Sequence, residues 1–221
     1  LLADLEARGK LMRVDSEYCL LTKEGAGWNH DFNQRRDRIL NDEALLGAER
    51  EKLLGEALVQ ALKPLSLQHG TARQPRKIEH CVMADRPKQP DDALVLWLRH
   101  GWSETAKRVE ADAKAAGSES PMIFGFLPRI GHDELKQGIA AQLAAQETLD
   151  AHGVPTTPEA IQAANAMKTQ LEAARLRVQG CMREIIANAQ VFLGGGNEIS
   201  GIELVDKVND GAADALHRLF P

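Results

Sequence analysis

Histidine and cysteine side chains are frequent metal ligands and nucleophiles, and four of them lie between residues 80 and 132: His80, Cys81, His100 and His132. Their separations match no metal-binding spacing, and no serine-hydrolase or zinc-hydrolase motif accompanies them. Cys81 falls within an apolar stretch, which is typical of a small core residue. We therefore expect no catalytic site and no metal site in this chain.

The glycine-rich segment 193–201 is a second candidate, because consecutive backbone N–H groups in such loops can bind phosphate. Gly196 and Gly201 have the spacing of a P-loop, but Ile202 and Glu203 stand where lysine and a hydroxyl residue must be. No strand is evident before the loop, so the segment is more typical of a helix C-cap or a hinge. We expect no cofactor here.

The most basic stretch is 71–88, where five basic residues and two acidic ones give a local charge of 5 − 2 = +3. Such side chains could contact DNA phosphates. The candidate DNA contacts are Arg73, Arg76, Lys77, Arg86 and Lys88. No aromatic residue is interleaved for base stacking, and exposed loops are often charged for solubility, so both interpretations stay open.

Three further side chains are candidates for contact with a partner or an anion: Arg99, Trp102 and Arg129. Each follows an apolar run that has the character of a buried parallel strand, at 93–98 and at 122–127. Ligands of open α/β sheets bind at the carboxyl ends of such strands. The alternative is that these residues only cap the sheet edge.

The elements that position these residues form three consecutive segments. In segment 1–64 we expect a helix at 2–8, a hairpin that pairs 12–14 with 18–21, and two amphipathic helices. A helix followed by a hairpin is the order of elements found in the last part of a winged helix. Segment 65–132 contains a strand at 78–83 and a βαβ unit with parallel strands. Its crossover helix begins after Ser103 and ends at Gly117.

Segment 133–221 is predicted to be helical, with helices at 133–152, 158–192 and 202–220. Apolar residues of the second helix recur at alternating spacings of three and four, which predicts a long antiparallel helical hairpin. Together the segments predict a helix-rich α/β fold.

The amino-acid composition of the chain argues against several classes of function. The chain has 221 residues, 43% of them hydrophobic, and a net charge of −5, which gives no global reason for binding nucleic acid or a membrane. Three cysteines, far apart, favour a reducing cytoplasm over a disulfide framework. The sequence begins at Leu1, and we expect it to be part of a longer protein.

Several motifs, in their order along the chain, resemble one family. They are GKLM at 9–12 and onward to Trp28, LWLRHGW at 96–102, SPMIF at 120–124, AQETL at 145–149, GVP at 153–155, AQVFLGGG at 189–196 and LHRLFP at 216–221. In these motifs the chain resembles the large P-loop proteins of bacterial BREX phage-resistance systems, called BrxC, and their PglY relatives. None of the motifs is a catalytic signature.

The resemblance implies an internal region of a large antiviral-defence ATPase, outside its ATP-binding motifs, so ATP is expected only for the parent protein. Two hypotheses follow for this chain. One is a non-catalytic scaffolding region that docks other BREX proteins or further copies of itself. The other is a DNA-contacting module that uses the winged helix and the basic stretch.

Overall fold

The computed structural model describes residues 11–14, 17–20, 22–71 and 73–220. The chain folds into two compact units, each assembled from two chain segments. The helical unit comprises the described residues of Leu1–Lys52 together with Gly131–Cys181. The sheet unit comprises Leu53–Ile130 and Met182–Pro221, as far as they are described. This division differs from the three consecutive segments expected from the sequence, because helices far apart in the chain pack together.

The helical unit is built around helices α2 (Lys23–Leu40) and α5 (His132–His152). It also includes the first part of α3 (Glu43–Leu62) and most of α6 (Pro158–Ala187). Strands β1 (Leu11–Val14) and β2 (Glu17–Leu20) pair antiparallel, as the predicted hairpin requires. The helix expected at 2–8 lies outside the described residues, and with it the winged-helix interpretation.

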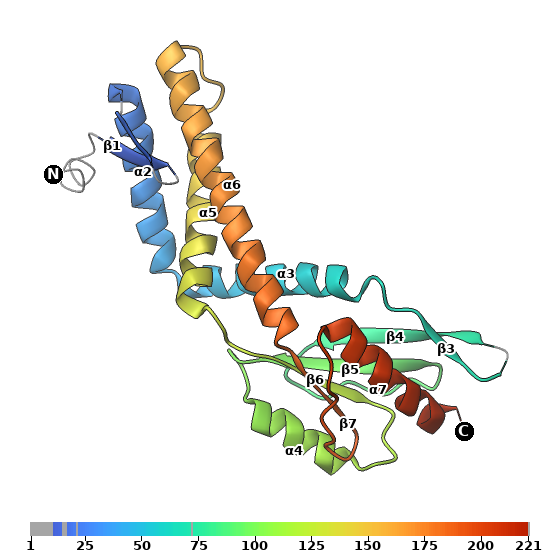
Figure 1. Ribbon diagram of the computed structural model, residues 1–221. Helices are drawn as coiled ribbons and strands as arrows, with labels where there is room; N and C mark the ends of the chain where they lie inside the picture. Colours follow the sequence, from blue (N-terminus) through green and yellow to red (C-terminus); the bar gives the residue numbers. More distant parts are fainter. Residues whose placement is uncertain (1–10, 15–16, 21, 72, 221) are drawn as a thin grey trace. The chain divides into compact units, whose positions relative to one another are not determined.

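Local sequence explains where α2 begins and what it buries. The Thr22 side chain accepts a hydrogen bond from the Gly25 backbone N–H at 3.0 Å and so caps the first turn. Trp28, Phe32 and Ile39 recur on one face and are buried. This helix packs chiefly on α5, which lies beside it in Figure 1.

Helix α6 carries the predicted apolar seam. Its seam residues are all buried, namely Ala164, Met167, Leu171, Ala174, Val178, Cys181 and Ile185. Within the helical unit α6 contacts α5, where Arg175 Nη2 donates to Gln146 Oε1 at 3.4 Å. Val178 lies against Gly138, whose missing side chain makes room for it.

The sheet unit contains one five-stranded sheet in the order β3-β4-β5-β6-β7. The strands are β3 (Leu67–His69), β4 (Gln74–Val82), β5 (Ala93–His100), β6 (Ile123–Leu127) and β7 (Gln190–Leu193). β4, β5 and β6 are parallel, whereas β3 and β7 are antiparallel to their neighbours. The predicted βαβ unit of β5, α4 (Ala106–Ala116) and β6 is therefore present, inside a mixed sheet.

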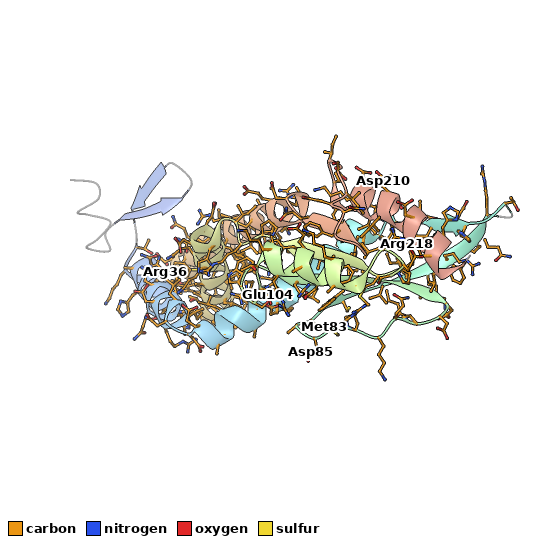
Figure 2. The ribbon with its side chains drawn as sticks, turned by 90° about the horizontal axis from the view of Figure 1, so that it is seen from below. Arg36, Met83, Asp85, Glu104, Asp210 and Arg218 are labelled. Carbon is orange, nitrogen blue, oxygen red and sulfur yellow. The ribbon has the colours of Figure 1, made fainter. Side chains whose placement is uncertain are left out.

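Helices cover both faces of this sheet (Figure 1). Trp97 and Phe124 pack with Val109 and Ala113 of α4 in one core cluster. Leu193 belongs to the opposite face and lies near Gly211 of α7 (Leu204–Leu219). Figure 2 labels Asp210 and Arg218, which both lie on α7.

Two short strands correct the sequence-based expectation. The predicted helix 158–192 ends at Ala187, and its last three residues, together with Leu193, instead form β7. Asn188 ends the helix, with its side-chain amide donating to the Glu184 carbonyl at 2.9 Å. β3 was not predicted, and β4 begins at Gln74 rather than at 78.

Candidate functional site

The basic stretch does not form a single surface. Arg76 pairs with Leu67 in β3 and places its guanidinium 3.7 Å from the centre of the Phe220 ring, on the α7 side of the sheet. Lys77, the next residue in the strand, is exposed and faces the opposite side. Arg73 lies in the turn before β4, with a φ of 47°. Of the five predicted DNA contacts, the two that lie in a strand, Arg76 and Lys77, thus point to opposite faces of the sheet.

Arg86 and Lys88 lie in the loop 83–92 that follows β4, the loop that carries Met83 and Asp85 in Figure 2. Arg86 and Lys88 are both exposed. The same loop contains three acidic residues, Asp85, Asp91 and Asp92, so its formal charge is 2 − 3 = −1. The acidic residues of this loop therefore offset the positive charge of Arg86 and Lys88.

The Arg99 side chain forms an ion pair inside the sheet unit. Its side chain is 4% exposed, and its Nη1 lies 2.5 Å from Asp112 Oδ2 of α4. The guanidinium also stacks over the Trp97 ring at 4.1 Å from its centre. Its Nε and Nη2 atoms are buried against this ring without a hydrogen-bond acceptor. A guanidinium covered in this way is not available to a partner.

Trp102 and Arg129 lie beyond the carboxyl ends of β5 and β6, as the parallel strand order predicted. The Trp102 ring meets the His100 ring edge-on, with centroids 5.8 Å apart. Gly101 donates its N–H to the Leu127 carbonyl at 2.9 Å, and it lies against the Arg129 backbone. The Arg129 side chain is exposed. Arg99 and Arg129 therefore share a sheet end, but only Arg129 presents its side chain to solvent.

Cys81 behaves as a core-edge residue. Its Sγ lies 3.9 Å from the Leu96 carbonyl oxygen, and its side chain packs against the cluster under α4. Burial raises the pKa of the Cys81 thiol, and the nearby Glu79 carboxylate adds to the effect. A raised pKa leaves less thiolate, which is the opposite of what nucleophilic catalysis requires. Among the described residues, no three histidine, cysteine or acidic side chains gather into a possible metal site.

The glycine-rich turn after β7 has a structural role at the end of α4. Gly195 donates its N–H to the Ala113 carbonyl at 2.8 Å and thereby satisfies a C-terminal carbonyl of that helix. A side chain at Gly194 would meet the Gly117 carbonyl oxygen at 2.5 Å. Arg218 of α7 donates to the Gly194 and Ser120 carbonyls at 3.3 and 3.1 Å. The turn therefore does not cap the helix before it, as the sequence analysis expected, because β7 lies between them; it contacts the end of α4 instead.

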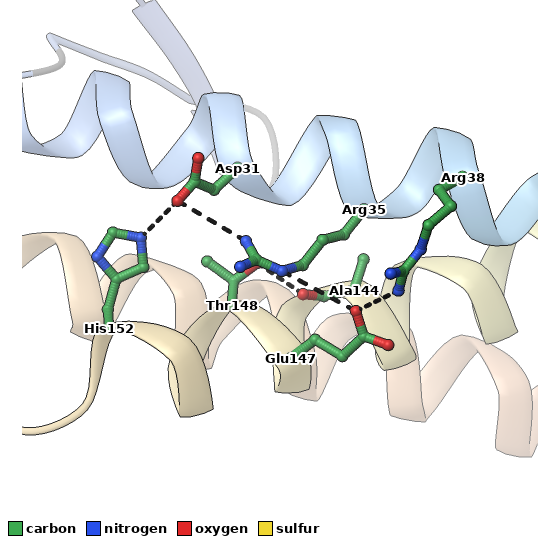
Figure 3. Close-up of polar contacts among 7 residues, drawn as sticks. All are labelled: Asp31, Arg35, Arg38, Ala144, Glu147, Thr148 and His152. Carbon is green, nitrogen blue, oxygen red and sulfur yellow. Dashed lines mark hydrogen bonds and ion pairs between the residues drawn. The ribbon is translucent and has the colours of Figure 1, made fainter.

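An ion-pair network joins α2 to α5 within the helical unit, which the sequence analysis did not anticipate (Figure 3). Arg38 Nη2 lies 2.6 Å from Glu147 Oε2, and Arg35 Nε lies 3.9 Å from the same oxygen. Further along the helix pair, Asp31 Oδ2 lies 2.9 Å from His152 Nε2. These side chains contact each other across the helix pair, so the network serves the packing of two helices.

A second feature that the sequence analysis missed is a groove of about 470 Å³ in the sheet unit. One wall comes from the end of α3 and the chain that follows it, with Val59, Leu62, Lys63, Leu65 and Leu67. The other wall comes from consecutive residues of β4, Arg76 to His80, and from Leu96 of β5. Val59 is 51% exposed although it is apolar. The groove thus combines apolar side chains from α3 and the chain after it with charged side chains of β4.

Comparison with known proteins does not extend this description: no family model, no curated protein and no solved structure matches the chain. None of the described helices combines the length and the apolar character needed to span a membrane.

Proposed function

We propose that this chain is a non-catalytic interaction region that docks a partner protein through the groove beside β4. In the context that the sequence resemblance suggests, it belongs to a large P-loop ATPase of a BREX phage-defence system and binds another protein of that system. The observation that carries the proposal is the half-exposed Val59 in an open apolar groove. A single exposed apolar side chain is common on protein surfaces, so the support comes from the concave setting in which Val59 lies together with Leu62 and Leu65.

The alternative of a DNA-contacting module has less support. Arg76 and Lys77 face opposite sides of the sheet, and the loop with Arg86 and Lys88 has an excess of acidic residues. DNA binding needs several cations on one surface, because each neutralised phosphate contributes to affinity. Of the five candidate residues, only Arg76 and Lys77 line a common feature, the groove, and they do so from opposite faces of the strand.

Site-specific photo-crosslinking tests docking in the full-length protein inside its own cells. A photoreactive amino acid replaces Val59 in one variant and Ile202, which is 88% exposed but outside the groove, in a matched control. We expect a nuclease-resistant protein adduct at position 59 and none at position 202. Equal adducts at both positions, or none at 59, would overturn the proposal.

A titration of the purified chain into labelled duplex DNA, at about 50 and 200 mM salt, tests the alternative. We expect no binding at either salt concentration. Binding that weakens steeply with salt and is lost on combined substitution of Arg73, Arg76 and Lys77 by alanine would replace protein docking with DNA contact.

A further inference from the structure

The outer edge of β4 is only partly paired. β4 bonds to β5 through Lys77 to Val82, but its other side bonds to β3 only through Gln74 to Arg76. The chain before β3, residues 63–66, leaves the line of the sheet and forms no strand. Along 77–82, the backbone groups that point away from β5 therefore have no strand partner among the described residues. Such an edge can accept another strand.

The groove opens directly onto this edge. Side chains of a strand alternate between its two faces, so a pocket on one face would be lined by every second residue. Here Arg76, Lys77, Ile78, Glu79 and His80 all line the groove. Lining by consecutive residues places the groove at the edge of the strand, and Leu96 of β5 shows that it also extends over one face of the sheet, with the apolar end of α3 as its far wall.

The charges around the groove favour an acidic occupant. Its lining includes three basic side chains, Lys63, Arg76 and Lys77, and one acidic side chain, Glu79, which gives 3 − 1 = +2 with His80 neutral. The whole chain has the opposite charge, −5. Opposite charges across an interface favour association and select the partner.

We propose that an extended, acidic segment of a partner protein adds to the open edge of β4 as a further strand. Its backbone would pair with residues 77–82, a length of about 20 Å at 3.3 Å per residue. Alternate apolar side chains would enter the groove against Val59 and Leu62, and carboxylates would meet Lys63 and Lys77. This is strand addition, in which backbone hydrogen bonds supply affinity and side-chain pockets supply specificity. The inference rests on the proposed docking function and specifies the mode and chemistry of that docking.

A second copy of this chain fits the edge less well. Two copies joined edge to edge would bring two positively charged grooves together, and like charges facing each other disfavour association. Lysine on an exposed strand edge is also a known means of preventing such self-pairing. The same lysine is complementary to an acidic strand.

The probe for this proposal is a labelled heptapeptide that alternates valine and glutamate, added to the purified full chain and followed by fluorescence anisotropy. The matched controls are the same peptide with lysine in place of glutamate, and one with a central proline that cannot complete a strand. We expect saturable binding of the acidic peptide and at least tenfold weaker binding of both controls. Equal binding of the lysine peptide would overturn the charge argument, and equal binding of the proline peptide would overturn strand addition.

Variants and amide hydrogen exchange locate the site. Val59→Glu and Lys77→Glu are each expected to weaken peptide binding about tenfold, whereas Ile202→Glu and Lys88→Glu, outside the groove, leave it unchanged. Backbone amides of residues 77–82 should exchange more slowly when the peptide is bound. Unchanged exchange there, or concentration-dependent dimerisation that protects these amides without peptide, would overturn the proposal. Crosslinking at Val59 without peptide binding would refute strand addition while leaving partner docking intact.

Discussion

Arg99 and Asp112 form an ion pair between the carboxyl end of β5 and the middle of α4, with Arg99 Nη1 at 2.5 Å from Asp112 Oδ2. The arginine is 4% exposed and the aspartate 22% exposed, so most of the contact is shielded from water. Arg108 Nε also lies 3.4 Å from Asp112 Oδ1, but that side chain is 64% exposed. The Asp112 carboxylate thus pairs with one buried arginine, Arg99, and one exposed arginine, Arg108.

We expect Asp112→Asn to lower the free energy of unfolding by about 2–3 kcal/mol, because it leaves the buried charge of Arg99 without its carboxylate. Arg108→Gln is the control and should change the free energy by less than about 0.5 kcal/mol, as is usual for exposed ion pairs. Urea unfolding followed by tryptophan fluorescence measures both. Joint replacement of Arg99 by methionine and Asp112 by leucine should regain most of the loss, and equal effects of the two single substitutions would contradict the interpretation.

A matched pair of glycines in the helical unit tests the packing of α5 against α6. A methyl group at Gly138 would lie 2.9 Å from Val178 Cγ2, whereas one at Gly27 on α2 would meet no atom of the described residues within 4 Å. Gly138→Ala should therefore destabilise the protein by about 1–3 kcal/mol through overpacking. Gly27→Ala should stabilise it by up to about 1 kcal/mol, because alanine has the higher helix propensity. Thermal unfolding monitored by circular dichroism compares the two, and a stabilising Gly138→Ala would show that these helices do not pack closely there.

The sequence predicted the elements that have long periodic patterns. The seam of α6, from Ala164 to Ile185, and the apolar run of β5 are both placed correctly, because burial of one helix face leaves a regular spacing and burial of a strand on both faces leaves a continuous apolar run. The boundary between α6 and β7 was missed since Phe192 continues the heptad spacing of Ile185. A short apolar run is compatible with either a helix or a strand. Here residues 190–193 pair with β6 at the edge of the sheet, so they form a strand.

The candidate groove could not be predicted in the same way. Its lining comes from three separate stretches, at 59–67, at 76–80 and at Leu96, which only the sheet topology brings together. For Arg99, the position at a strand end was predicted from the sequence. Its pairing with Asp112 was not, because that contact depends on how α4 crosses the sheet. Local charge counts likewise cannot show that Arg76 and Lys77 face opposite sides.

The Cys81 thiol gives a prediction on reactivity and on pH dependence. Burial, and secondly Glu79, raise the pKa of this thiol in the folded protein, so at pH 8 it should react with iodoacetamide more slowly than in the urea-unfolded chain. A variant with Cys19→Ser and Cys181→Ala isolates the signal. Because the folded pKa is the higher one, the stability linked to this group is fully present below the ordinary thiol pKa and is lost as pH rises through the folded value.

Glu79→Gln is the control for the cause of this shift. It removes the smaller of the two contributions, so the pKa of Cys81 should fall only slightly and alkylation should speed up modestly. The pH dependence of thiolate absorbance measures the pKa directly. A folded-state pKa at or below the ordinary value would contradict the burial argument and would make Cys81 a candidate reactive thiol after all.

The start of α2 offers a last test, at a single hydrogen bond. Thr22 Oγ1 accepts from the Gly25 N–H at 3.0 Å, and without it that donor has no partner within the helix. Thr22→Ala should cost about 1 kcal/mol of stability, whereas Thr22→Asn, which keeps a capping acceptor, should cost little. Amide hydrogen exchange of Gly25 is the specific readout, since loss of the cap should speed its exchange in the alanine variant alone. If the asparagine variant exchanges as fast as the alanine variant, the side chain of Thr22 is not what holds the first turn of α2.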